Sequence, residues 1–153
     1  MFKMENVVDW KSWLVVGGTV LITVAVVSVN EPDNIPYGRK MLWYALDGVM
    51  MEVPQRMMMQ TFMCLLLDMW GIDIVFSVLV TAIVWCISIC IQCVIMKSKF
   101  DKSVGVELLS SFIFSVGAGV VLIRTELIVF TMVAHFMERI VSTEIRRRKY
   151  VVG

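Results

Sequence analysis

The stretch "VFSVLVTAIVWCISICIQCVIM", Val75 to Met96, carries no charged residue over its whole length. About 20 consecutive apolar residues suffice for one helix to cross the hydrocarbon core of a bilayer. The other structure that lipid tolerates, a closed β-barrel, requires short strands of alternating polarity, and this run is continuous. The stretch therefore predicts a transmembrane helix, within a span at 72–96, and an all-α fold.

The composition of the whole chain agrees with this prediction. Its 153 residues are enough for one domain, so we treat residues 1–153 as a single membrane domain. Hydrophobic residues make up 59% and the mean hydropathy is +0.82, whereas soluble domains are close to half apolar. The net charge of +1 indicates no nucleic-acid partner. The partner that the composition does imply is membrane lipid.

Four further runs join the span at 72–96. They lie at 12–29, 41–70, 104–123 and 127–142, and the second ends at "DMWG", where Gly71 can cap a helix. The lead-in "MFKMENVVDWK" lacks the features of a cleaved signal peptide, so we expect an uncleaved first span. Together the runs predict a polytopic transmembrane helix bundle of about five membrane-embedded helices.

Lysine and arginine are distributed unevenly between the two expected sides of the membrane. Five crossings place nine of them on one side and three on the other. The nine are Arg39, Lys40, Lys97, Lys99, Lys102, Arg146, Arg147, Arg148 and Lys149, and the three are Lys3, Lys11 and Arg124. Because positive residues are enriched in cytoplasmic loops, we expect the N-terminus outside and the C-terminus in the cytoplasm. The basic tail would also lie against anionic headgroups.

The run at 41–70 contains an unusual polar stretch, "DGVMMEVPQRMMMQ", Asp47 to Gln60. Its polar residues continue a spacing of four that places them on one helical face: Glu52, Arg56, Gln60, Cys64 and Asp68. A charge at membrane depth costs roughly 2.5–3.5 kcal/mol unless it is paired or faces a cavity. We therefore expect Glu52 to pair with Arg56, Gln60 to extend the pair, and Pro54 to kink the helix.

Two polar residues lie outside this stripe. Asp47 precedes Glu52 by five positions, roughly 140° round a helix, so we expect it to pair with another element. The only histidine, His135, lies in "FTMVAHFMERI" near the same side of the membrane, with Arg139 four residues on. Two interpretations stay open: a buried polar network that fixes helix packing, or a functional site.

Neither a metal nor a cofactor is expected. Cys86, Cys90 and Cys93 spell C-x3-C-x2-C, a spacing also found in cluster-binding enzymes, where the thiolates converge from a loop. Here the spacing lies inside the clearest span and places three small apolar side chains on one face for packing. One histidine and scattered carboxylates do not supply the three protein ligands usual at a catalytic zinc.

The order of three short motifs resembles a known family. An acid-x-x-x-Arg helix, then an apolar helix with "SSFIF", then a helix with "AHF" cover about residues 41–142. This arrangement resembles the CPBP family of intramembrane endopeptidases, which includes CAAX-processing proteases and bacterial relatives tied to bacteriocin immunity. The family's motifs are Glu-Glu-x-x-x-Arg, Phe-x-x-x-His and His-x-x-x-Asn. A Glu and a His activate water, while a second His and the Asn stabilise the oxyanion.

The resemblance assigns roles to individual positions and implies a bacterial plasma membrane. The family-motif positions that survive are Glu52, Arg56 and His135, with Asp47, Gln60, Phe114 and Arg139 as supporting residues. Met51 stands in place of the catalytic Glu, Ala118 in place of the motif-two His, and Arg139 in place of the Asn. Because Met51 and Ala118 cannot move protons, the resemblance implies weak peptidase activity or none.

Three hypotheses follow. In the first, the chain lacks the usual active site and binds a peptide or lipidated partner, with an immunity or regulatory role. In the second, it is an active atypical endopeptidase that uses Glu52 as a substitute base together with His135. Glu52 would face away from the usual water position, since one residue turns a helical side chain by ~100°, unless the Pro54 kink re-aims it. In the third, the chain is a structural bundle with no site.

Overall fold

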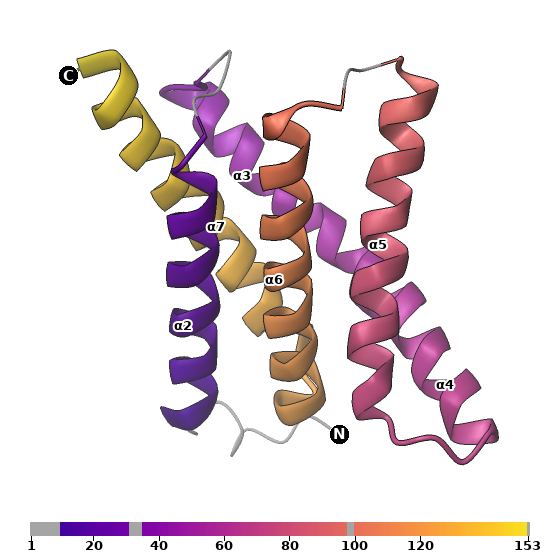
Figure 1. Cartoon of the computed structure of the whole chain (residues 1–153). Helices are drawn as coiled ribbons and strands as arrows, with labels where there is room; N and C mark the ends of the chain where they lie inside the picture. The colour runs from indigo at the N-terminus through magenta and orange to yellow at the C-terminus, as the bar shows by residue number, and fades with distance from the viewer. Residues whose placement is uncertain (1–9, 31–34, 98–99, 153) are drawn as a thin grey trace.

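The computed structural model describes residues 10–30, 35–97 and 100–152, which contain helices and no strand (Figure 1). The expected all-α fold is confirmed for this part of the chain. The helices are α2 (Trp10–Val27), α3 (Arg39–Glu52), η1 (Val53–Gln60), α4 (Thr61–Met69), α5 (Val75–Ile95), α6 (Lys102–Thr125), α7 (Ile128–Arg147) and η2 (Arg148–Val152). Most of the lead-in and the middle of the loop at 30–40 lie outside the described residues, as does Lys99.

Three of the described helices, α2, α5 and α6, are long and apolar enough to cross a membrane. They indicate a membrane protein, but they are fewer than the five spans expected from the sequence. The run at 41–70 divides into three shorter elements, of which α3 has 14 residues and α4 has 9. Helix α7 is long enough, but it carries five charged residues between Glu138 and Arg147.

The bundle is organised around α6, which packs against α2 on one side and α5 on the other (Figure 1). Helix α7 packs on α2, α3 and α6. The apolar core lies where α2, α6 and α7 meet and consists of Val16, Val20, Val24, Phe114, Ala118, Val121, Phe130 and Ala134. Gly117 permits the close approach of α2 to α6, because a Cβ at this position would overlap the side chain of Thr19.

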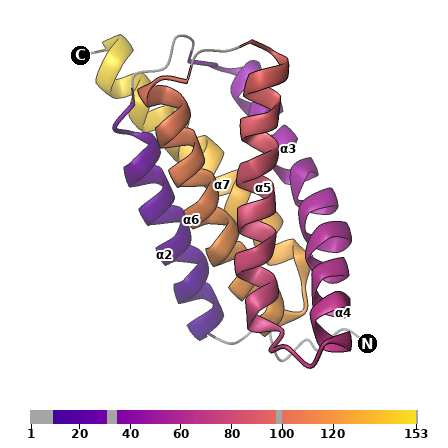
Figure 2. The ribbon, with the colours of Figure 1, turned by 45° about the vertical axis from the view of Figure 1, so that its right-hand side comes forward.

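Helices α3, η1 and α4 follow one another as one long column that reaches α5 at its lower end (Figure 2). The predicted cap at its end is confirmed: Gly71 has φ 67°, and the Ile72 N–H donates to the Leu67 carbonyl at 2.9 Å. The starts of α3 and α6 lie at the same end of the bundle as the end of α7, and the α4–α5 turn lies at the opposite end (Figure 1).

The segment η1 is a π-helix of 8 residues with Pro54 near its start. The sequence predicted a local distortion at Pro54, because proline lacks the backbone donor of a regular turn. The observed form, with i→i+5 hydrogen bonds, was not predicted. Its turns are wider than those of an α-helix. In an α-helix, residues four apart are rotated slightly more than one full turn, so a spacing of four drifts around the axis. In the wider π-helix, four residues make slightly less than one full turn. The two rotations offset each other, and the stripe stays on one face.

Candidate functional site

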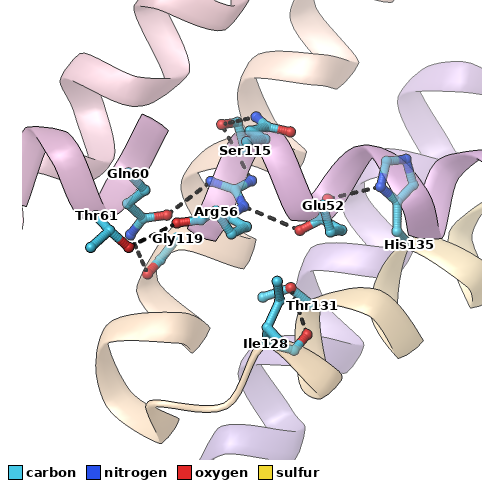
Figure 3. Close-up of polar contacts among 10 residues, drawn as sticks. Glu52, Arg56, Gln60, Thr61, Ser115, Gly119, Ile128, Thr131 and His135 are labelled. Atoms are coloured by element: carbon cyan, nitrogen blue, oxygen red, sulfur yellow. Dashed lines mark hydrogen bonds and ion pairs between the residues drawn. The ribbon is translucent and has the colours of Figure 1, made fainter. Parts of the chain in front are cut away.

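The polar stripe of α3 and η1 is buried in the interior of the bundle. Glu52 and Arg56 are both 0% exposed. The Arg56 Nε donates to Glu52 Oε2 at 3.2 Å, and its Nη1 donates to Gln60 Oε1 at 3.1 Å (Figure 3). The ion pair and the extension through Gln60 expected from the spacing are therefore both present.

Helix α6 completes this network with small residues. The Ser115 hydroxyl accepts from Gln55 Nε2 at 2.8 Å and from Arg56 Nη2 at 3.4 Å. The Gln60 Nε2 donates to the Gly119 carbonyl at 3.2 Å (Figure 3). Gln55 and Ser115 were not predicted, because a lone amide and a lone serine in apolar runs give no periodic signal. We call the group Glu52, Gln55, Arg56, Gln60 and Ser115 the inner network.

His135 on α7 joins the inner network through Glu52. Its Nδ1 lies 2.8 Å from Glu52 Oε1, and the Phe114 ring lies against the imidazole at 4.5 Å between centroids. Gly48 permits this contact, because a Cβ there would lie 3.1 Å from His135 Nε2. Both oxygens of Glu52 are thus engaged, one by Arg56 and one by His135. Sequence reasoning also missed the role of Gly48.

Arg139 covers the other nitrogen of the imidazole. Its Nε donates to His135 Nε2 at 3.4 Å, and its Nη1 donates to the Tyr44 hydroxyl. The guanidinium also lies 4.5 Å from the centre of the Tyr44 ring. A neutral imidazole with its proton on Nδ1 satisfies both of its contacts, since Nδ1 then donates to Glu52 and Nε2 accepts from Arg139.

The expectation for Asp47 is wrong. Asp47 is exposed and forms no hydrogen bond or ion pair with another residue in the described ranges. The physical reason is helical geometry: Gly48 and Glu52 face α7, whereas Asp47 is turned by about 100° from Gly48. The acid that meets His135 is Glu52.

The stripe is also shorter than predicted. Cys64 turns to α5, where its thiol contacts the Ser77 hydroxyl at 3.0 Å. Asp68 is exposed near the end of α4. Both residues lie beyond η1, where the helix returns to α geometry and the spacing of four drifts around the axis. The buried polar face therefore ends at Gln60.

A cavity of about 260 Å³ lies beside the inner network. Its buried end is lined by Phe114 and His135, and its other lining residues include Met51, Gln55, Tyr44 and charged side chains from α6 and α7. Glu52 and Ala118 are not among its lining residues; both are buried behind it. Water in the cavity can therefore reach His135 but cannot reach the Glu52 carboxylate.

The charged lining residues are Glu107, Glu138, Arg139 and Arg146. Of these four residues, only Arg139 was predicted as a site residue. Glu138 is only 5% exposed and was missed, although it lies three residues after His135, a spacing that places both on one side of a helix. Within the residues the structure describes, no group of three or more metal-ligating side chains comes together.

The geometry provides the parts of a general base. A buried carboxylate orients a histidine that lines a cavity, and a catalytic imidazole is prepared to accept a proton by such a carboxylate when its second nitrogen is free. Here that nitrogen is capped by Arg139 instead of facing open space. No protein-family model, curated protein or solved structure matches this chain.

Proposed function

We propose that this chain is a polytopic membrane protein related to the CPBP endopeptidases that has kept the scaffold of their site and lost the chemistry. It binds a peptide or lipidated partner in its cavity, in an immunity or regulatory role. The observation that carries the proposal is that Met51, not an acid, lines the same cavity as His135, while Glu52 is fully buried and does not line it. In the resemblance, the position of Met51 belongs to the acid that activates water.

The contacts of Glu52 support its assignment as a structural group. A base must reach the proton that it removes, either directly or through one water. Glu52 is fully buried, and its oxygens are held by Arg56 and His135. The carboxylate therefore orients the imidazole and balances the Arg56 charge, and it cannot replace the acid absent at Met51.

Arg139 supports the same conclusion. It stands where the family has an Asn, and it donates to the histidine nitrogen that would otherwise face a substrate. Tyr44 holds its guanidinium through the hydroxyl and the ring. Catalysis would require this contact to open, whereas a binding role does not.

The test combines loss and gain of peptidase activity in lipid vesicles. The purified chain is incubated with CAAX-type and broad peptide libraries, and we expect no cleavage. The double variant Met51→Glu with Arg139→Asn should gain cleavage, because it places a carboxylate in the cavity and uncovers His135. Met51→Gln with Arg139→Asn is the matched control, since glutamine has the same shape and no basic carboxylate. His135→Ala should abolish any gain.

A second candidate function, an active atypical endopeptidase, is favoured by the 2.8 Å contact between Glu52 and His135. In this mechanism His135 Nε2 takes a proton from water, the hydroxide attacks the peptide carbonyl, and the same proton passes to the departing amine. Glu52 stays ionised and stabilises the imidazolium. Cleavage by the unmodified chain that is lost in both Glu52→Ala and His135→Ala would establish this function and overturn the first.

The proposal includes five membrane-embedded helices, with α7 and the α3–α4 column beside the three apolar spans, and a cytoplasmic C-terminus. The distribution of lysine and arginine supports this orientation. It predicts that single cysteines introduced near Arg148 and near Asp73, in a chain whose own four cysteines are replaced, react from opposite sides of sealed vesicles. Labelling of both from one side would contradict it.

A further inference from the structure

The outer half of the cavity contains one charge without a partner and one that forms only a long ion pair. Arg146 forms no hydrogen bond or ion pair within the described residues, and its Nε is buried. The nearest basic group to Glu138 is Arg139, with 3.7 Å between Oε2 and Nε, too long for a hydrogen bond. The Thr23 hydroxyl of α2, which also lines the cavity, is buried without a partner. This set of Thr23, Glu138 and Arg146 is the outer set.

The outer set presents opposite charges to one space. Glu138 and Arg146 are eight residues apart on α7, which places their Cα atoms about 12 Å apart along the helix. A long side chain on a helix points back towards the N-terminus, so the Arg146 guanidinium extends towards Glu138. Both line the cavity, yet neither pairs with the other. The space between them therefore suits a ligand that carries a cation and an anion.

We propose that the outer half of the cavity binds a zwitterionic phospholipid headgroup with a phosphate and a primary ammonium, as in phosphatidylethanolamine. Arg146 holds the phosphate and Glu138 holds the ammonium. The inference goes beyond the proposed function: it concerns the outer part of the same cavity, and Glu138 and Arg146 lie outside the motif positions on which the resemblance to peptidases rests.

The chemistry of the lining selects each half of the headgroup. A guanidinium presents its donors in a planar fork that matches the oxygens of a phosphate. An ammonium offers three donors, and the cavity supplies acceptors for them in the Glu138 carboxylate and the hydroxyls of Ser110 and Ser111. A choline headgroup has no donor for these acceptors and would leave them unsatisfied.

The size of the whole cavity admits a headgroup. A volume of about 260 Å³ corresponds to roughly nine water molecules at liquid density, and phosphoethanolamine has about eight non-hydrogen atoms. The source of the headgroup is the bilayer, because the cavity lies among helices whose outer surfaces carry exposed apolar side chains, such as Ile87, Ile91 and Val94 of α5.

The test measures lipid retention by the intact chain. The purified protein is reconstituted in mixed bilayers of phosphatidylethanolamine, phosphatidylcholine and phosphatidylglycerol, extracted gently, and the retained lipids are quantified by native mass spectrometry. We expect phosphatidylethanolamine to be enriched about tenfold or more over phosphatidylcholine, the ratio that one charge-assisted hydrogen bond provides. Equal retention of these two lipids overturns the proposal. Preferential retention of phosphatidylglycerol also overturns it and assigns the basic residues to anionic lipid.

Variants locate the site. Glu138→Gln and Arg146→Met should each reduce the enrichment to near one, whereas Arg146→Lys, which keeps a charge for the phosphate, should retain part of it. Arg148→Met is the matched control, because Arg148 is exposed and pairs with Glu144 outside the cavity. A loss with Arg148→Met equal to that with Arg146→Met would indicate general surface attraction and overturn the assignment. Helicity, measured for each variant, confirms that the fold is kept.

Competition with soluble phosphoethanolamine distinguishes a phospholipid headgroup supplied by the bilayer from a free zwitterion with the same phosphate and ammonium groups. If the bilayer supplies the headgroup, millimolar phosphoethanolamine should not displace the retained lipid. Displacement by soluble phosphoethanolamine at concentrations equal to the lipid would overturn the lipid assignment in favour of a free zwitterion.

Discussion

The inner network and the outer set each contain a glutamate and an arginine. In the inner network the two form a hydrogen-bonded ion pair, whereas in the outer set they do not pair with each other. Glu52 and Arg56 are four positions apart, so their side chains lie one above the other and meet. Glu138 and Arg146 of the outer set are eight positions apart, which places their Cα atoms about 12 Å apart along α7, and they do not pair with each other. Spacing alone therefore makes one acid–base pair part of the scaffold and leaves the other available to a ligand.

The largest expected effect is on the free energy of unfolding and concerns the Glu52–Arg56 pair of the inner network. Replacing Arg56 by Met leaves Glu52 buried without its cation, which should cost about 3–5 kcal/mol of unfolding free energy. Glu138→Gln should cost far less, because it removes a charge that has no hydrogen-bonded partner. Unfolding in lipid bicelles, followed by circular dichroism, measures both.

A double substitution makes this prediction sharper. Glu52→Gln together with Arg56→Met removes both charges, so it should be less destabilising than Arg56→Met alone. If the single variants at Arg56 and Glu138 were equally stable, the distinction between a structural pair and an available one would be wrong.

A smaller effect compares packing at two glycines of α6, one near its start and one in its second half. Gly117→Ala places a methyl group where Thr19 lies, so we expect α2 to shift at a cost of about 1–3 kcal/mol. Gly105→Ala, near the outer end, meets open space and should stabilise the helix by about 0.5–1 kcal/mol. Opposite signs in the same unfolding assay are the expected result, and destabilisation by both variants would contradict it.

The smallest effect concerns pH at the exposed end of α7. Hydrogen bonds from Arg147 and Arg148 lower the pKa of Glu144 from 4.5 to about 2. A lowered pKa in the folded state means that these contacts stabilise the helix end fully above about pH 4.5 and are lost as the pH falls through about 2. Amide exchange of the last turn should therefore stay slow at pH 4 and increase near pH 2.

The control for this pH effect is Glu144→Gln, which should exchange at the same rate at both pH values once intrinsic exchange is subtracted. Fraying that begins already at pH 4.5 in the unmodified chain would show that Glu144 gains nothing from Arg147 and Arg148. The magnitude is small, because exposed ion pairs contribute little to stability.

Helical periodicity accounts for what the sequence could predict. The all-α fold, the Gly71 cap and the Glu52–Arg56–Gln60 contacts follow from apolar run length, a known C-terminal signal and a spacing of four. The same rule failed for Cys64 and Asp68, because it assumes one helical pitch from Glu52 to Asp68 and the π-helix changes that pitch. Three of the five expected spans form helices long and apolar enough to cross a membrane, whereas the run at 41–70, which contains buried charges, does not form one long apolar helix.

The remaining site residues depend on contacts between helices, which one sequence does not contain. Nothing at Tyr44 or Gly48 indicates that α7 lies against them, and Ser115 is one of several serines in its region. Asp47 was a candidate partner for His135 because both residues are expected near the same side of the membrane. A similar membrane depth, however, does not determine which way a side chain points around its helix axis. Nothing in the sequence around Glu138 indicates that it lines a cavity, because its neighbours there come from other helices.

The π-helix has one more consequence, which concerns rotation. Because its wide turns advance fewer degrees per residue than α-helical turns, η1 fixes the angle between α3 and α4 about their common axis. If η1 relaxed to an α-helix, α4 would rotate against α5 and separate Cys64 from Ser77. The eight residues after Glu52 therefore set the rotation of α4 relative to α3. As a result, the column directs its charged side chains to α7 at one end and its packing face to α5 at the other.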